Sequence, residues 1–239
     1  GNTPFFYQDY ILGRESIVLK GEPYFNTKHL YQKQSLAESW CELFNLPFDG
    51  NNNPELFYND VEIKSLDGIL QGDKPILMMQ TNGGPYESTK KYCWTRDLPF
   101  DQVQILANEL SKNYTIVQVA RPNCNKIPNA VMVNDLPDKR VLLGLLLKTE
   151  KRILIDSCLQ HAAAAFNLPS TVCWVGTSPK VFGYELHNNI LPNIKKLPHM
   201  DQTINSIFFD HDFNGPEAEY PFESSNIFNL QDIYDSIVK

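Results

Sequence analysis

The sequence predicts an α/β fold built on a parallel, doubly wound sheet. Short apolar segments alternate with amphipathic segments over residues 75–176, which is the pattern of strands joined by crossover helices. The apolar segments are nearly continuous rather than alternating, as expected for strands covered on both faces. Because such crossovers are right-handed, the alternation favours a Rossmann-like domain. A chain of 239 residues is long enough to bury a sizeable core.

Each predicted strand and helix of residues 75–176 has a hydrophobic pattern of its own. The segment Pro75–Gln80 is a buried-type strand, followed by a glycine-containing turn. In Phe100–Leu110 the apolar residues share one face of a helix. Further strands are expected at Tyr114–Val119, Asn129–Val133, Arg152–Ile155 and Thr171–Val175, and further helices at Lys139–Lys148 and Leu159–Asn167.

The flanking regions are less regular. Phe5–Ile11 and Ser16–Leu19 are expected as short strands, and His29–Phe44 as one helix that ends at Asn45. A final helix is expected at Leu230–Val238. The predicted division is a short partial N-terminal α/β segment with a linker (1–72), a ligand-binding Rossmann-like domain (73–200) and a C-terminal extension that carries the final helix (201–239).

Composition excludes several classes of function. The net charge of −7 argues against nucleic acid as a partner, because Lys and Arg are too few to neutralise phosphates. The five cysteines are scattered without a C-x-x-C pair, which favours a reducing compartment and no disulfide framework. The five histidines show no metal-binding spacing, so no metal or cofactor is expected. The longest apolar run, Val141–Leu147, is too short to span a bilayer, so no transmembrane segment is expected, and the N-terminus lacks a signal-peptide pattern.

Two predicted strand ends carry residues suited to ligand binding, because ligands of open parallel sheets bind at the carboxyl ends of strands. The first is Thr81–Pro85, where paired glycines let backbone amides approach a ligand. This segment is either a phosphate-contacting loop or a plain tight turn. No G-x-G-x-x-G or Walker A motif is present, so a standard dinucleotide fingerprint is absent.

The second strand end is Asp156-Ser157, where a strand leads directly into an alanine-rich helix. Asp156 or Ser157 can cap the helix, and the remaining free amides and the helix dipole then favour a pyrophosphate. His161 lies one turn into the helix and can reach the same ligand. The alternative is a well-capped buried helix with His161 as a core residue.

The residues around this helix resemble glycosyltransferase family 9, the heptosyltransferase-type enzymes of bacterial lipopolysaccharide biosynthesis. The family signature reads D-S-G-x-x-H-x-A-A-A, followed by x-x-P, a strand and G-x-T-x-P. The matching segments are Asp156–Ala165, Asn167–Val172 and Val175–Pro179. The resemblance covers roughly residues 75–190 and is most specific over Asp156–Pro179.

The resemblance implies a GT-B fold, of which this chain holds mainly the C-terminal, donor-binding domain. It implies binding of a nucleotide-diphospho-sugar of the ADP-heptose type and metal-independent, inverting transfer to a lipopolysaccharide, another glycan or a lipid-linked acceptor. It also implies a cytoplasmic protein that acts at the inner face of the membrane, with peripheral association. The donor-binding residues it implies are Thr81, Asn82, Gly83, Arg121, Asp156, Ser157, Cys158, Leu159 and His161.

The sequence departs from the family pattern at three positions. Cys158 replaces the signature glycine, and we expect it to be a small buried residue. Tyr92 stands where the family places a lysine, and Arg121 follows the second strand where a ribose-binding glutamate is usual; Arg121 can instead meet a phosphate or a base. The cations that can replace the missing lysine are Lys90, Lys91 and Arg96.

Residues 1–72 are too few for the front domain that supplies the acceptor site and catalytic base in this family. We therefore expect a truncated or naturally short member that is incomplete for catalysis; Asp9 and Glu15 carry no mark of a base, and no catalytic residue is identified. Two alternatives remain: a non-catalytic sugar-nucleotide binding module and a sugar-nucleotide epimerase-like enzyme. The latter needs an acid/base pair, and no second titratable group is expected opposite His161.

Overall fold

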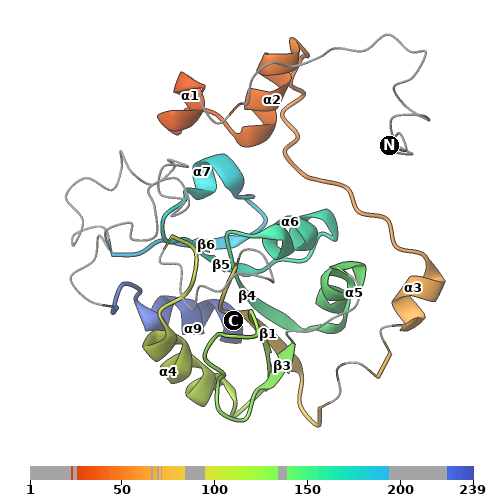
Figure 1. Cartoon of the computed structure of the whole chain (residues 1–239), viewed down its shortest axis with the longest axis vertical. Helices are drawn as coiled ribbons and strands as arrows, with labels where there is room; N and C mark the ends of the chain where they lie inside the picture. The colour runs from red at the N-terminus through yellow and green to blue at the C-terminus, as the bar shows by residue number, and fades with distance from the viewer. Residues whose placement is uncertain are drawn as a thin grey trace.

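The computed structural model confirms the α/β class. It describes residues 23, 26–65, 67–68, 70, 72–83, 95–133, 139–193 and 225–239. Six parallel strands form one sheet in the order β3-β2-β1-β4-β5-β6, the order of a doubly wound Rossmann fold (Figure 1). The strands are β1 (Ile76–Gln80), β2 (Thr115–Val119), β3 (Val131–Val133), β4 (Lys151–Ile155), β5 (Thr171–Cys173) and β6 (Asn188–Ile190).

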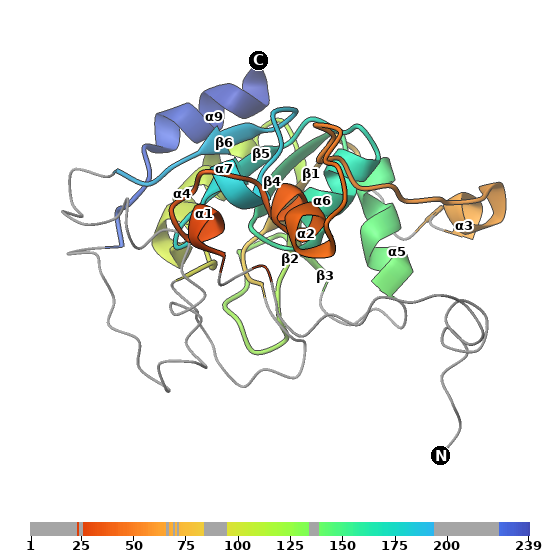
Figure 2. The same ribbon diagram turned by 90° about the horizontal axis from the view of Figure 1, so that it is seen from above.

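Helices cover both faces of the sheet, as the crossover connections require (Figures 1 and 2). Helices α4 (Phe100–Leu110) and α9 (Leu230–Val238) pack against each other on one face. Helix α5 (Lys139–Gly144), the 3₁₀ helix η3 (Leu145–Lys148) and α6 (Cys158–Ala165) lie on the other. The remaining helices are α1 (Thr27–Leu30), α2 (Leu36–Phe44), α3 (Asp60–Ser65) and α7 (Pro179–Phe182).

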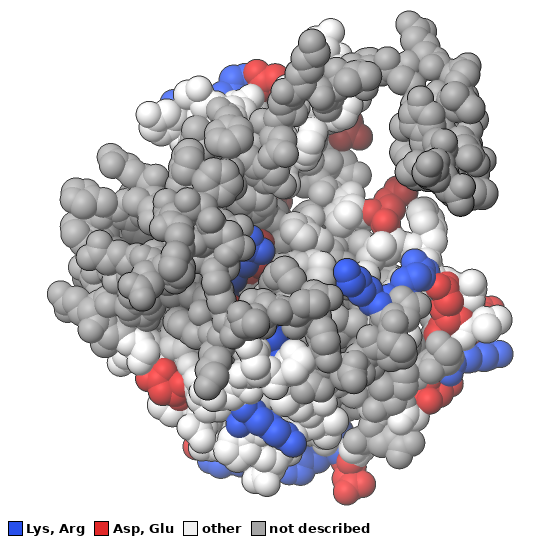
Figure 3. Space-filling view, in the orientation of Figure 1, with Lys and Arg blue, Asp and Glu red and all other residues white. Residues whose placement is uncertain are grey.

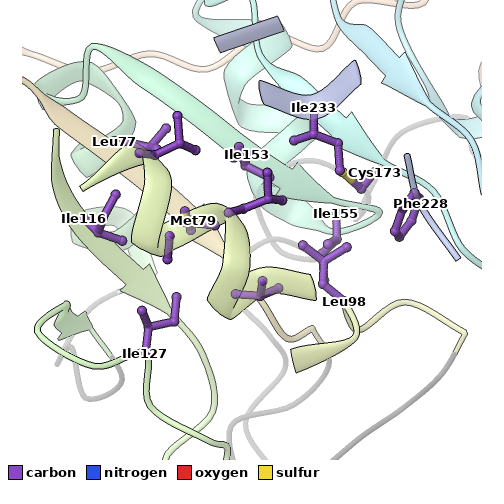
Figure 4. Close-up of a cluster of buried hydrophobic side chains, with 14 of the residues drawn as sticks. Leu77, Met79, Leu98, Ile116, Ile127, Ile153, Ile155, Cys173, Phe228 and Ile233 are labelled. Carbon is purple, nitrogen blue, oxygen red and sulfur yellow. The ribbon is translucent and has the colours of Figure 1, made fainter. Parts of the chain in front are cut away.

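The alternation of side chains along β1 divides the core into two layers. Leu77 and Met79 point to the face that α4 and α9 cover, and Met78 points to the face that η3 and α6 cover. Figure 4 shows the first layer, in which Ile233 of α9 joins residues of the central strands. Because Ile233 and Ile237 are 1% exposed, the final helix is part of the same core as the sheet.

The prediction of a single helix over His29–Phe44 is wrong. The chain forms α1 and α2, separated by Gln32 in the left-handed region (φ 56°) and by Ser35, whose side chain caps α2 by accepting from the Glu38 amide. The end of α2 is as expected, with Asn45 in the left-handed conformation that closes helices.

The N-terminal helices contact the sheet domain through side chains. His29 of α1 packs its ring against Phe182 of α7, with 5.5 Å between centroids. The Ser178 hydroxyl donates to Gln32 Oε1 over 2.8 Å. Further along, Arg140 of α5 forms an ion pair with Glu62 of α3.

The other expected elements are confirmed with shifts of a few residues at their ends, except that Lys139–Lys148 is α5 followed by η3. The sequence reasoning missed α3, α7 and β6. The expected strands Phe5–Ile11 and Ser16–Leu19 lie outside the described residues. Within the described part of the chain, no helix combines the length and apolar character needed to cross a membrane. Figure 3 shows acidic and basic side chains interspersed over the described part of one face.

Candidate functional site

The candidate site lies where β1 and β4 are neighbours in the sheet. The chain leaves β1 toward β2 on one side and leaves β4 toward β5 on the other, so the strand order reverses between them. In parallel sheets this switch point opens a crevice at the carboxyl ends of the two strands, where ligands bind. Here those ends are Gln80 and Ile155.

The N-terminus of α6 begins at this edge. Ser157, in extended conformation, caps the helix: its hydroxyl oxygen accepts from the Leu159 amide (3.3 Å), and its carbonyl accepts from the Gln160 amide (3.2 Å). The Ser157 hydroxyl also donates to Gln80 Oε1 over 2.7 Å, which ties the start of α6 to the end of β1. The first-turn amides and the positive end of the helix dipole make this helix start favourable for an anion.

The carboxylate of Asp156 is open to a ligand: its oxygens are not among the buried, unpaired side-chain atoms of the described residues, so they still reach solvent. The residue is only 9% exposed, and among the described residues no hydrogen-bond donor to it is found. Its negative charge acts on two neighbours, His161 and Tyr184. Because its oxygens reach solvent and no protein donor takes them within the described part of the chain, Asp156 can accept hydrogen bonds from a ligand.

His161 has a titratable partner, contrary to the expectation from the sequence. Its Nδ1 lies 2.7 Å from the Tyr184 hydroxyl, and the two rings meet edge to face. Burial lowers the pKa of His161, although the charge of Asp156 partly opposes this. Burial, together with Asp156, raises the pKa of Tyr184 to about 12. At neutral pH the phenol therefore keeps its proton.

The loop after β1 is held by a buried carboxylate, Asp97. One oxygen of Asp97 accepts from the Gly83 amide (2.9 Å), and the other accepts from Asn82 Nδ2 (3.0 Å). The Thr81 hydroxyl donates to Asn82 Oδ1 (2.8 Å) and accepts from Gln118 Nε2 (3.0 Å). The Thr81–Gly83 segment is thus fixed by side chains from three parts of the sequence, which is more than a plain tight turn requires.

Arg121 lies in the same network. Its Nη2 forms an ion pair with Asp97 over 2.9 Å, with the two side chains 6% and 0% exposed, and its Nη1 donates to the Gly83 carbonyl. Because the positive charge of Arg121 is already neutralised by Asp97, it is not a free cation for a phosphate. Its Nε is buried and has no hydrogen-bond partner in the described part of the chain.

The remaining predicted residues fall into distinct environments. Cys158 is exposed, so the expectation of a small buried residue is wrong. The Leu159 side chain is fully buried in the core, which leaves only its backbone amide near the edge. Lys90 and Lys91 lie outside the described residues, whereas Arg96 is described and half-buried.

The structure thus brings the predicted residues together in two groups: Asp156–Leu159 with His161 at the end of β4, and Thr81–Gly83 with Arg121 at the ends of β1 and β2. Sequence reasoning missed Gln80, Asp97 and Tyr184. The described residues contain no group of three His, Cys, Asp or Glu side chains that could hold a metal ion.

Comparisons with known proteins bear on the fold. Neither protein-family models nor curated protein sequences give a match. Among solved structures, a family 9 glycosyl transferase from Veillonella parvula matches with a TM-score of 0.55 at 8% identity, over 85% of this chain and 59% of that one. The ADP-heptose LPS heptosyltransferase II of E. coli matches with a TM-score of 0.48 at 18% identity, over 64% and 49%. The E. coli heptosyltransferase WaaC with ADP matches with 0.44 at 14% identity, over 77% and 57%.

The chain therefore spans about half to three fifths of the length of these solved structures. At such low identity the likeness concerns the fold alone, and of these three structures the one from V. parvula has a TM-score above 0.5. Together with the strand order, it confirms the Rossmann-like fold that was expected from the sequence, which this chain shares with part of the V. parvula structure.

Proposed function

We propose that this chain is a glycosyltransferase-like protein that binds a nucleotide-diphospho-sugar donor at the carboxyl edge of β1 and β4. The observation that carries the proposal is the solvent-reaching carboxylate of Asp156, which has no hydrogen bond among the described residues, beside the start of α6. A carboxylate accepts hydrogen bonds from sugar hydroxyls, and helix amides donate to phosphate. A sugar joined to a diphosphate satisfies both groups at once.

Each side chain of the edge then has a role. The Cys158 amide and the positive end of the α6 dipole contact the diphosphate, while Ser157 keeps the first turn of the helix in place. Asp156 accepts from the sugar. In sugar transfer the diphosphate is the leaving group, so preorganised amides at this position would stabilise the charge that develops on it.

The finer identity of the reaction follows from the family resemblance. The donor is proposed to be of the ADP-heptose type, and the reaction to be metal-independent, inverting transfer to a lipopolysaccharide or another glycan. Such an acceptor would place the protein in the cytoplasm, at the inner face of the membrane. All donor contacts named here lie in the domain proposed at residues 73–200.

The test is binding of ADP, GDP and UDP and of their sugar conjugates to the purified chain, measured by calorimetry and by thermal shift. A ligand at 100 times its Kd should stabilise the fold by about 2.7 kcal/mol. We expect an ADP-sugar to bind more tightly than ADP in the wild type, and this difference to disappear in Asp156→Ala. Asp101→Ala, on the surface of α4, is a matched carboxylate control that should bind like the wild type.

Absence of binding by every nucleotide and conjugate would contradict the proposal. Slow hydrolysis of the bound donor, followed by release of the sugar, would distinguish a transferase from a non-catalytic binding module, which would bind the donor and leave it intact.

A further inference from the structure

The buried ion pair of Asp97 and Arg121 encloses one peptide segment from both sides. Asp97 accepts from the Gly83 amide (2.9 Å), and Arg121 donates to the Gly83 carbonyl. The second oxygen of Asp97 is shared by Arg121 Nη2 (2.9 Å) and Asn82 Nδ2 (3.0 Å). Both backbone polar groups of Gly83 are therefore taken by one charged pair.

Three strand ends meet in this network. Asn82 and Gly83 follow β1, and Arg121 lies two residues after the end of β2. Through Gln80, the end of β1 is also bound to Ser157, which caps α6 after β4. Gln80 Nε2 additionally contacts the Asn82 carbonyl over 3.4 Å. The segment that the ion pair holds is thus connected by hydrogen bonds to the helix start at which the diphosphate is proposed to bind.

Stability alone does not account for such a pair. Removing two charges from water is costly, and a buried ion pair is often no more stabilising than apolar side chains of the same volume. What the pair supplies is directionality, because a carboxylate and a guanidinium fix the peptide between them in one orientation. Sites that bind ligands depend on such supporting hydrogen bonds to keep contact groups in place.

We propose that Asp97 is a positioning residue of the site, which together with Arg121 fixes the Asn82–Gly83 backbone at the end of β1 for the incoming donor. The inference rests on the proposed function. It differs from the expectation that Arg121 contacts phosphate directly, because the charge of Arg121 is engaged by Asp97. Direct phosphate contact by Arg121 predicts that Asp97→Asn binds nucleotide as tightly as the wild type or more tightly. The positioning role of Asp97 predicts weaker binding.

The first experiment needs no ligand. Hydrogen exchange at the Gly83 amide should be slow in the wild type and faster by at least about tenfold in Asp97→Asn, relative to amides of the central strands. The double variant Asp97→Asn/Arg121→Gln removes both charges but retains an acceptor and a donor for Gly83, so it should recover protection. Unchanged exchange in Asp97→Asn would overturn the inference whether or not the chain binds nucleotides.

The second experiment measures the Kd for ADP. We expect Asp97→Asn to weaken binding about tenfold or more, as when one charge-assisted hydrogen bond of a site is lost, and the double variant to return to within about threefold of the wild type. If Asp97→Asn does not fold, the double variant is compared with the wild type directly, and a loss beyond about tenfold overturns the inference. Tighter or equal binding by Asp97→Asn would instead support direct phosphate contact by Arg121.

Arg152→Met is the matched control. Arg152 is also a buried arginine that donates to backbone carbonyls, those of Thr149 and Glu150, but it lies near the amino end of β4, at the opposite edge of the sheet. Arg152→Met should lower the Tm and leave the Kd for ADP unchanged. If Arg152→Met raised the Kd as much as Asp97→Asn does, general destabilisation would explain the weaker binding, and the inference would be overturned. If the wild type binds no nucleotide while Gly83 exchange responds as expected, the proposed function fails rather than the positioning role.

Discussion

Replacing Asp156 with Asn should weaken donor binding while lowering the stability of the free protein by no more than about 1 kcal/mol. The carboxylate is 9% exposed and has no hydrogen-bond donor among the described residues. Its oxygens still reach solvent, and an amide at the same place is also polar, so neutralisation relieves little desolvation. It removes the favourable interaction of the charge with the N-terminus of α6, which is worth about 0.3–1 kcal/mol. The expected result is therefore a fall in Tm of no more than about 4 °C for a chain of this size.

The assay is thermal and urea unfolding of the wild type, Asp156→Asn and Asp97→Asn without ligand. Asp97 is the comparison, because it is a fully buried carboxylate whose two oxygens are both hydrogen-bonded. Its neutralisation leaves Arg121 buried without a counter-charge and should cost about 3–5 kcal/mol. The same substitution should thus lower the Tm far more at Asp97 than at Asp156. A fall in Tm for Asp156→Asn as large as that for Asp97→Asn would refute the reasoning, since it would mean that the carboxylate already has good partners in the free protein.

Three further predictions follow from the same edge of the fold. Iodoacetamide should modify the exposed Cys158, and a bound nucleotide should slow this reaction severalfold, as measured by peptide mass spectrometry; unchanged reactivity would mean that the ligand binds elsewhere. Ser157→Ala removes the cap of α6 and should lower the free energy of unfolding by about 1 kcal/mol, which urea unfolding detects; no change would show that the cap is dispensable. Burial lowers the pKa of His29, His161 and His187 below 6.5, so the unfolded chain binds more protons than the folded one under mild acid. The free energy of unfolding should therefore fall below pH 6.5, by up to about 1.4 kcal/mol per pH unit for each histidine, and a Tm that stays constant from pH 7 to 5 would contradict this.

The central sheet could be predicted because its strands are short apolar segments between helices with clear periodicity. The edge strand β6 could not, since Asn188–Ile190 is short, mostly polar and only partly buried. The break between α1 and α2 was also missed: Leu30 and Leu36 fit one helical stripe, and only the left-handed Gln32 and the cap at Ser35 separate the two helices.

The site was predictable only where its residues are neighbours in the sequence. Asp156-Ser157 and His161 share one strand–helix junction, so their spacing carried the signal. Asp97 binds residues 14, 15 and 24 positions away, and Tyr184 lies 23 positions after His161. Contacts at such separations depend on the order of the strands in the sheet. That order cannot be read from the local residue pattern of a single sequence.

The most direct test of the account is a titration of the ¹⁵N-labelled chain with ADP, followed through its backbone amide signals. If the diphosphate binds at the start of α6, the amides of Cys158 and Leu159 should show the largest downfield proton shifts, with smaller changes at Gly83. Saturation by ADP with these signals unmoved, and the changes gathered instead at the amino edge of the sheet near Arg152, would contradict the account.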